Sequence, residues 1–336
     1  MGRMALSAWL VLASAMGAAA ADDFYKNKTI TIINSTGNGG SYFNIAQAIS
    51  RHMPRYIPGA PAIIVKSMPG GGNVLATNFM YVSAPKDGTY IATINNSIPL
   101  HQALDGRGIQ YDVTKFNWIG STGTYNSIAY VWAAAGFKSI QDVFKREVVL
   151  GGTGVGSSIV IYPAAMNALL GAKFKIVLGY KATSEIDLAM ERGEVQARTG
   201  SYTGLRSDHP DWLSEKKVDI LMQIGSVRDP ELPDVPLLSE LGRNDDERKI
   251  LELISAPIAL GRPYLAPPGV PEDRLAMLRS AFDQTLRDEA FLAEARKMDH
   301  EIAPQSAQEV ADIVSRTINA PPAIIQRAKE VMGPME

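Results

Sequence analysis

Three glycine-rich turns are the segments of this chain whose residue types are best suited to bind a ligand. They span residues 37–41, 69–73 and 151–158, and each lies beside an apolar β-like run or a helical pattern. Glycine lets a backbone approach a ligand closely, and the free N–H groups of a following helix favour negative charge. Together the turns predict a cradle of backbone amides for an anionic solute.

The third turn does not have the pattern of a nucleotide-binding loop. No lysine precedes Ser157, and the glycine spacing differs from G-x-G-x-x-G. Ser157 and Ser158 stand at a predicted helix start, where they can cap the helix and donate hydrogen bonds to an anion. In the second turn, three consecutive glycines carry an entropic cost that close approach to a ligand would explain. Ligand contact is therefore favoured over a plain tight turn in both.

Residue types for catalysis or metal binding are not grouped in this sequence. It lacks a G-x-S-x-G elbow and an H-E-x-x-H pair, and its histidines have no metal-like spacing. The four histidines are His52, His101, His209 and His300. The acidic run 245–247 and the pair Glu185 and Asp187 are predicted to be solvated charges at loops and helix starts. We predict no enzymatic activity, no cofactor and no metal, with a hydrolase or lyase acting on a carboxylate as the alternative.

The N-terminal segment predicts export. Arg3 precedes an apolar run at 5–15, and small residues continue to position 21, before Asp22. This pattern is typical of a secretory signal peptide, so residues 1–21 are predicted to be removed and the protein to be periplasmic. Cysteine is absent from all 336 residues, which excludes disulfides, thiolate nucleophiles and a lipidated cysteine anchor.

The charge balance argues against a nucleic-acid partner. Lysine and arginine number 33 against 35 aspartate and glutamate, for a net charge of -2. A nucleic-acid-binding protein would usually carry a basic patch and a basic overall balance. A hydrophobic content of 46% and a charged content of 20% are those of an ordinary globular protein.

Strand-like and helix-like patterns alternate along the chain. Short β-rich runs are predicted at 29–33, 62–65, 90–94, 148–150, 175–180, 195–198 and 218–224. Helical patterns are predicted at 42–53, 159–170, 184–192, along the apolar stripe from Leu275 to Leu286, and from 306 to 331 with a break at Pro321 and Pro322. This alternation predicts an α/β protein with doubly wound sheets.

The order of several motifs resembles a known family, the periplasmic solute receptors of tripartite tricarboxylate transporters, also called the Bug or tricarboxylate receptor family. The resemblance covers nearly the whole chain after the signal peptide. It is carried by GGSY at 39–42, RHMPRYIPG at 51–59, MPGGG at 68–72, APKDGT at 84–89, GTG with GS at 152–157, GY at 179–180, LAMERGEV at 188–195, APIALGRPY at 256–264 and APPGVP at 266–271.

The resemblance implies a two-lobed binding protein of the Venus-flytrap, type II-like class, which closes around its solute. Lobe one would hold 22–123 plus 258–336 and lobe two 124–257, with two crossings between them. The C-terminal segment is expected to pack on lobe one, and the first and third glycine turns to face each other. The implied ligand is a small carboxylate and the implied partners are the membrane subunits of the transporter. We expect a monomer; a receptor that serves a sensor is a further alternative.

The candidate ligand-binding residues come from the glycine turns and from polar positions after predicted strands. They are Gly39, Gly40, Ser41, Tyr42, Phe43, Gly71, Gly72, Asn73, Asn96, Ser97, Thr153, Gly154, Ser157, Ser158, Tyr180, Thr183 and Arg198. Arg198 either grips a distal carboxylate or belongs to an ion pair.

Position 43 is a departure from the resembled family. Many relatives have aspartate where this chain has Phe43, so a carboxylate able to pair with a ligand ammonium is missing there. An amino-acid ligand is therefore disfavoured. The ring of Phe43 either lines the cleft, which would suit an apolar or aromatic carboxylic acid, or points into the core of its lobe.

Overall fold

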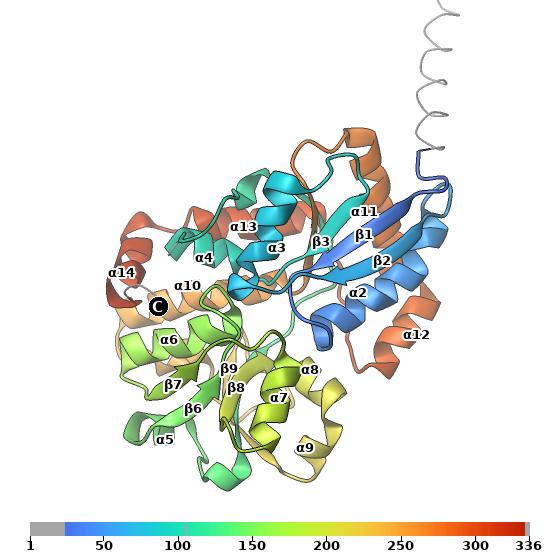
Figure 1. The fold of residues 1–336 in the computed structure, drawn as a ribbon. Helices are drawn as coiled ribbons and strands as arrows, with labels where there is room; N and C mark the ends of the chain where they lie inside the picture. The colour runs from blue at the N-terminus through green and yellow to red at the C-terminus, as the bar shows by residue number, and fades with distance from the viewer. Residues whose placement is uncertain (1–23, 105, 333–336) are drawn as a thin grey trace, which may run out of the picture.

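The computed structural model describes residues 24–104 and 106–332, so the predicted signal peptide lies outside the described residues. The described chain forms two mixed sheets with helices packed around them (Figure 1). The six-stranded sheet has the order β11 (Gln305–Ser306), β4 (Asn117–Ser121), β10 (Pro263–Ala266), β3 (Tyr90–Thr93), β1 (Thr29–Asn34) and β2 (Ala62–Ser67). The five-stranded sheet has the order β7 (Phe174–Val177), β6 (Val148–Gly151), β8 (Ala197–Ser201), β5 (Ser127–Trp132) and β9 (Val218–Ile224).

Each sheet is the centre of one lobe, and the protein is a two-lobed α/β structure. We call the lobe around the six-stranded sheet the first lobe and the other the second lobe. Helices of the first lobe are α2 (Ser41–His52), α3 (Val74–Asn78), α4 (Ile98–Leu104), α11 (Glu272–Arg287), α12 (Glu289–Lys297) and α13 (Ala307–Ile318). Helices of the second lobe are α5 (Ile140–Lys145), α6 (Ser158–Leu170), α7 (Thr183–Glu191), α8 (Tyr202–Asp208), α9 (Pro210–Ser214) and α10 (Asp245–Ser255).

Both sheets share one connection pattern. In the first, β1 pairs in parallel with β2 and β3, and β10 enters antiparallel beside β3. In the second, β6 pairs in parallel with β7 and β8, and β5 enters antiparallel beside β8. In each sheet, the strand that follows a crossing between the lobes therefore runs antiparallel to the three parallel strands.

Local sequence signals account for the helices that border the space between the lobes. Helix α6 begins after Ser157, whose hydroxyl accepts a hydrogen bond from the amide of Ile159, and it ends at Gly171, which has a φ of 73°. Helix α13 begins with a capping box between Ser306 and Glu309. These predicted helices are confirmed to within a residue or two at their starts.

The strands β4, β5 and β10 were not predicted. The side chains of β5 are buried at every position except the last, and those of β10 at every position. A short strand covered on both faces shows no alternation of polar and apolar residues, so its sequence lacks the usual strand signal. β10 also begins with Pro263, which argues against a strand in sequence-based reasoning.

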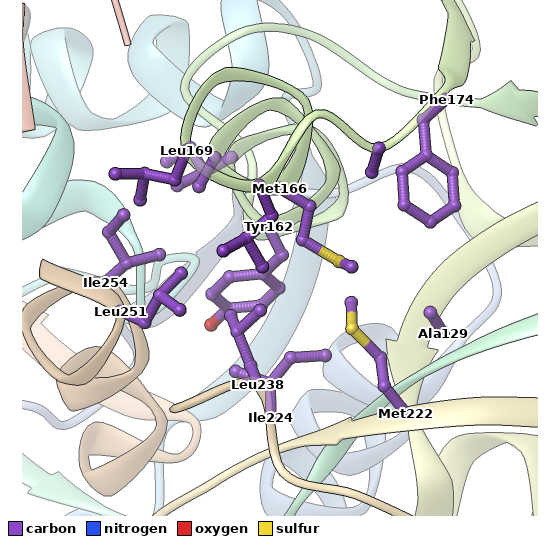
Figure 2. Packing of buried hydrophobic residues seen from close by; sticks show 14 of the residues in the cluster. Ala129, Tyr162, Met166, Leu169, Phe174, Met222, Ile224, Leu238, Leu251 and Ile254 are labelled. Atoms are coloured by element: carbon purple, nitrogen blue, oxygen red, sulfur yellow. The ribbon is translucent and has the colours of Figure 1, made fainter. Parts of the chain in front are cut away.

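The core of the second lobe lies between its sheet and helices α6 and α10. Figure 2 shows Tyr162, Met166 and Leu169 of α6 packed with Met222 of β9 and Leu251 of α10. All five side chains are buried. This packing holds the N-terminus of α6 rigidly against the second sheet.

The C-terminal segment divides between the lobes. Helix α13 packs on β4 of the first lobe, as expected, but α14 (Pro322–Met332) packs against α6 and α10 of the second lobe and also contacts α4 (Figure 1). Ala328 belongs to the same core cluster as the second sheet. The prediction that the whole segment packs on the first lobe is therefore wrong for α14. The break at Pro321 and Pro322 lets the chain change direction between the two helices.

No helix in the described part of the chain combines the length and the apolar character that crossing a bilayer requires.

Candidate ligand-binding site

A cavity of about 520 Å³ lies between the two lobes and is lined by both. This volume is in the usual range for small-molecule sites. Most of the candidate residues line it: Gly39, Gly40, Ser41, Tyr42, Gly71, Gly72, Asn73, Thr153, Ser157, Ser158, Tyr180, Thr183 and Arg198. The remaining candidates, Phe43, Asn96, Ser97 and Gly154, do not. The structure therefore brings most of the candidates to one place, while their contact with a ligand stays a prediction.

Three helices begin at this cavity. The first residues of α2, α6 and α7 are Ser41, Ser158 and Thr183, and all three line it. The first amides of a helix have no partner within the helix and carry partial positive charge. Neither α2 nor α6 has an acidic residue in its first turn to offset that charge. The cavity is consequently an environment of positive potential contributed from both lobes.

The start of α2 depends on glycine. Gly39 and Gly40 have φ values of 83° and 80°, a region that residues with a Cβ rarely adopt. A Cβ on Gly40 would also lie 2.7 Å from the hydroxyl oxygen of Thr183 on the second lobe. The glycines therefore allow both the turn into α2 and its close contact with the opposite lobe.

The second and third glycine turns touch each other across the interface. A Cβ on Gly72 would lie 2.4 Å from the amide nitrogen of Gly156, and one on Gly154 would lie 2.5 Å from the amide nitrogen of Gly72. The first turn instead contacts the loop before α7, where the amide of Gly37 donates to the carbonyl of Lys181 at 3.1 Å. The third turn thus meets the second directly, whereas the first and third were expected to face each other.

Tyrosine side chains form part of the cavity lining. The hydroxyl of Tyr42 donates to the carbonyl of Gly261 at 3.0 Å and accepts from the amide of Asn96 at 3.2 Å. Its single proton is then used, so Tyr125 is the donor in the 3.2 Å contact between the two hydroxyls. Tyr42 therefore offers its ring to the cavity. Tyr162 and Tyr180 also line it.

Two of the candidates outside the lining form hydrogen bonds with residues of the cavity wall or of the turns beside it. Asn96 is buried, and its amide bonds Tyr42. Ser97 is buried, and its hydroxyl lies 2.8 Å from the carbonyl of Gly156 on the second lobe, to which it can donate. Asn95, which we did not select, lines the cavity in their place.

The other two lie away from the cavity for different reasons. Gly154 is covered by Gly72 in the contact between the turns. Phe43 follows Ser41 and Tyr42 on α2, and each helical residue is rotated by about 100° from the last, which carries its half-buried ring away from the cavity. The suggestion that Phe43 selects an aromatic ligand therefore has no support from its position.

Arg198 lines the cavity and is committed to an ion pair inside the second lobe. Its Nε and one terminal nitrogen donate to the two oxygens of Asp187 at 2.5 and 3.0 Å, and both side chains are buried. His209 and Tyr130 also contact the same carboxylate, at 3.1 and 3.4 Å. The prediction that Asp187 is solvated is wrong, because the residue faces the sheet on the inner side of α7.

The Asp187 carboxylate is held in its charged form. Burial by itself would raise its pKa, but the charge of Arg198 and the hydrogen bond with His209 outweigh burial and keep the pKa of Asp187 below its ordinary value. Burial would lower the pKa of Arg198, but the charge of Asp187 and its hydrogen bond with Arg198 contribute to raising it. The pair is therefore internally neutralised and contributes little net charge to the cavity.

The other charged side chains of the lining are Lys181 and Asp208, both exposed. Desolvation raises the pKa of Asp208, although a hydrogen bond from Ser207 and the charge of Arg198 act in the opposite direction. Asp208 supplies a carboxylate within reach of a bound solute. The lack of a carboxylate at position 43 therefore does not exclude an ammonium-bearing ligand from the cavity.

Sequence reasoning missed the residues at the carboxyl ends of β1 and β8 and around the first crossing. Among them are Ser35, Thr36, Tyr125, Ser127, Thr199, Gly200 and Ser201. The small polar run 199–201 directly follows Arg198. Its composition, after a predicted strand, could have indicated that it belongs to the site. Tyr125 gave no such signal, because the strand that follows it was not recognised.

An ion pair closes the interface between the lobes at another point. Arg206 of α8 donates to Glu231 of its own lobe and to both oxygens of Asp299 on the first lobe, the latter at 2.7 and 2.8 Å. Asp299 follows α12 and has a φ of 54°. This ion pair therefore links α8 of the second lobe to the segment after α12 of the first lobe.

An Arg206→Gln variant should bind the solute about two- to fivefold more weakly, because a partly exposed pair contributes only up to about 1 kcal/mol. Its dissociation constant should also depend less on salt, since the pair is screened. Isothermal titration calorimetry at low and high salt measures both. Arg243→Gln removes a pair with Glu247 inside one lobe and should leave binding unchanged; equal effects of the two variants would contradict a role for the interlobe pair.

Among the described residues, no group of histidine, aspartate or glutamate side chains has the geometry to hold a metal ion.

A family model described as "Tripartite tricarboxylate transporter family receptor" matches residues 46–329. Among solved structures, the periplasmic binding protein BugD is similar with a TM-score of 0.73 and 17% identity, over 91% of this chain and 98% of its own. The family match covers the glycine turn at 69–73, which lines the cavity, and the turn at 151–158, of which Thr153, Ser157 and Ser158 line it.

Two structures from Rhodopseudomonas palustris contain ligands. MatC with bound malate has a TM-score of 0.70 and 19% identity, over 91% of this chain and 99% of its own. A second protein, solved with adipate, has a TM-score of 0.70 and 17% identity, over 91% of this chain and 97% of its own. At these identities the likeness is one of fold. No curated protein sequence matches this chain.

Proposed function

Because this chain belongs to the tripartite tricarboxylate transporter receptor family, we propose that it captures a small carboxylate between its lobes and delivers it to the membrane subunits of such a transporter. We place it in the periplasm, where the signal peptide predicted at residues 1–21 would direct it. Closure of the lobes around the solute would complete its hydrogen bonds and exclude water.

The observation that carries this proposal is the convergence of helix N-termini from both lobes on one cavity. Helix α2 of the first lobe and helix α6 of the second both start there without an acidic residue in the first turn. Such termini bind carboxylates through free amides and the helix dipole. The malate and adipate found in two proteins of the same fold are also carboxylates.

The amides available on α6 support this assignment. The hydroxyl of Ser157 accepts from the amide of Ile159, and the carbonyl of Ser157 accepts from the amides of Val160 and Ile161. The amide of Ser158, the first residue of the helix, has no acceptor at this helix start and lines the cavity. We propose that this amide donates to an anionic oxygen of the solute.

A Ser157→Leu variant should lose the thermal stabilisation that a carboxylate gives, because the bulky side chain would fill the space in front of α6. In the wild-type protein, a ligand at 100 times its dissociation constant should stabilise the fold by about 2.7 kcal/mol. Thermal unfolding with malate, adipate, benzoate, aspartate and the neutral diamide adipamide measures this effect and identifies the ligand class.

Ser157→Ala is the matched control. It removes the helix cap, which costs about 1 kcal/mol of stability, but adds no bulk, so its ligand-induced shift should persist. An unchanged shift in Ser157→Leu would contradict the assignment of this loop to the ligand. Binding of adipamide as tightly as adipate would contradict the proposal of a carboxylate ligand.

A further inference from the structure

Arg262 is a buried cation at the boundary between the lobes. It lies between the second crossing of the chain and β10, and only 2% of its surface is exposed. One terminal nitrogen donates to the hydroxyl of Thr203 on the second lobe at 3.2 Å, while its Nε has no hydrogen-bond partner. No ion pair of Arg262 with a carboxylate occurs within 24–104 and 106–332.

Two aromatic rings near this guanidinium belong to residues that line the cavity. The guanidinium carbon lies 4.3 Å from the ring centre of Tyr125 and 5.9 Å from that of Tyr42. Both tyrosines also line the cavity, and their hydroxyls are joined at 3.2 Å. The positive charge therefore contacts two residues of the cavity wall without itself belonging to the lining.

Among the residues that the structure describes, no group around Arg262 neutralises its charge. Burial raises the pKa of both Tyr42 and Tyr125, so their hydroxyls stay protonated. Burial and then the charge of Arg262 lower the pKa of His300 to about 3, so this histidine stays neutral. Its ring nitrogens have no partner in the described structure. The positive charge of Arg262 is thus surrounded by neutral side chains at this point of the interface.

The imbalance has an energetic consequence. A buried charge is costly unless it is paired, and a cation near an aromatic ring recovers only part of that cost. Arg198, the other buried cation next to the cavity, is matched by Asp187. Arg262 has no carboxylate partner among the described residues, so an anion in the cavity beside the two tyrosines would balance its charge.

We infer that Arg262 determines the selectivity of the cavity for anions, with the carboxylate of the solute as its counter-ion across Tyr42 and Tyr125. This inference rests on the proposed function and adds a residue outside the cavity lining to it. Arg262 is a positioning residue: it sets the electrostatic potential at the two tyrosines and, through its hydrogen bond to Thr203, contacts the second lobe.

The test compares Arg262→Met with the wild-type protein. Met keeps an unbranched side chain but removes the charge. The affinity for malate and adipate, measured by calorimetry, should fall about tenfold or more, whereas any affinity for adipamide should not fall. The melting temperature of the unliganded variant should equal or exceed that of the wild type, because a costly buried charge has been removed. A purely structural role would lower it.

Two further variants test whether the effect depends on a positive charge at position 262. Arg262→Lys keeps the charge and should retain most of the preference for adipate over adipamide. Arg316→Met removes one exposed positive charge on α13, outside the cavity lining, and should leave affinity unchanged. Unaltered affinity of Arg262→Met for the two dicarboxylates would overturn the inference. If no carboxylate binds the wild type, the proposed function fails, and a lowered melting temperature of unliganded Arg262→Met would then overturn the inference independently.

Discussion

A Gly154→Ala variant should lose at least about tenfold in solute affinity, because its single added methyl group blocks the closure of the two lobes. A Cβ at this position would lie 2.5 Å from the amide nitrogen of Gly72 and 3.0 Å from its Cα. The obstructing atoms are backbone atoms, which cannot move aside as a flexible side chain can. The φ of Gly154 lies outside the left-handed region, so alanine is tolerated within the second lobe itself.

The effect should therefore appear in binding and not in folding. Calorimetry with the best carboxylate measures the loss of affinity, thermal unfolding without ligand should be nearly unchanged, and small-angle X-ray scattering should show no compaction on adding ligand. Gly156→Ala is a graded control in the same turn, since its Cβ would meet the carbonyl of Gly72 at 3.0 Å, and it should have a smaller effect. Wild-type affinity of Gly154→Ala would show that the solute does not require this contact.

An Asp187→Asn variant should lower the free energy of unfolding by about 3 to 5 kcal/mol, the usual cost of leaving a buried charge without its partner. Asp187 accepts two hydrogen bonds from Arg198, and both side chains are at most 5% exposed. Asparagine has the same shape but cannot neutralise the guanidinium. Urea or thermal unfolding measures the change.

An exposed ion pair in the same lobe provides the control for the loss of a buried one. Asp211 pairs with Lys217 on the surface of the same lobe, and Asp211→Asn should change stability by less than about 1 kcal/mol. A similar small effect for Asp187→Asn would mean that water or another group compensates Arg198, and it would contradict the account of the buried pair.

Acid should remove the difference between the wild type and Asp187→Asn. The folded pKa of Asp187 is depressed below its ordinary value of about 3.9. Its contribution is therefore complete above the unfolded pKa and is lost as pH falls through the folded one. The free energies of unfolding of the wild type and of Asp187→Asn should begin to converge as the pH falls from about 5, and should continue to converge below about 4.

Much of the scaffold was predictable because its signals are local. The run 29–33, the turn 37–41 and the helix from 42 are contiguous, and each obeys a rule about neighbouring residues. The same holds for α6, with Ser157 at its start and Gly171 at its end. Elements without a local signal, such as β5 and β10, were missed because their burial is imposed by the rest of the sheet.

The candidate site was predictable to the extent that it consists of helix starts. Ser41, Ser158 and Thr183 line the cavity because the amides of a helix N-terminus lie in front of the helix axis. Phe43 was misjudged because one further residue rotates the side chain to another side of the helix. Asp187 was misjudged because the charge pattern of a helix does not say which face a sheet will cover.

The sequence alone determined the alternating elements, the glycine turns and the order of motifs that marks the family, since these depend on residues close together in the chain. The tertiary structure decided which turns meet, that Arg198 pairs with Asp187, that Arg262 is enclosed without a carboxylate partner among the described residues, and that α14 packs on the second lobe. These are contacts between distant segments. Their geometry follows from how two lobes pack against each other, and no spacing within a single segment contains that information.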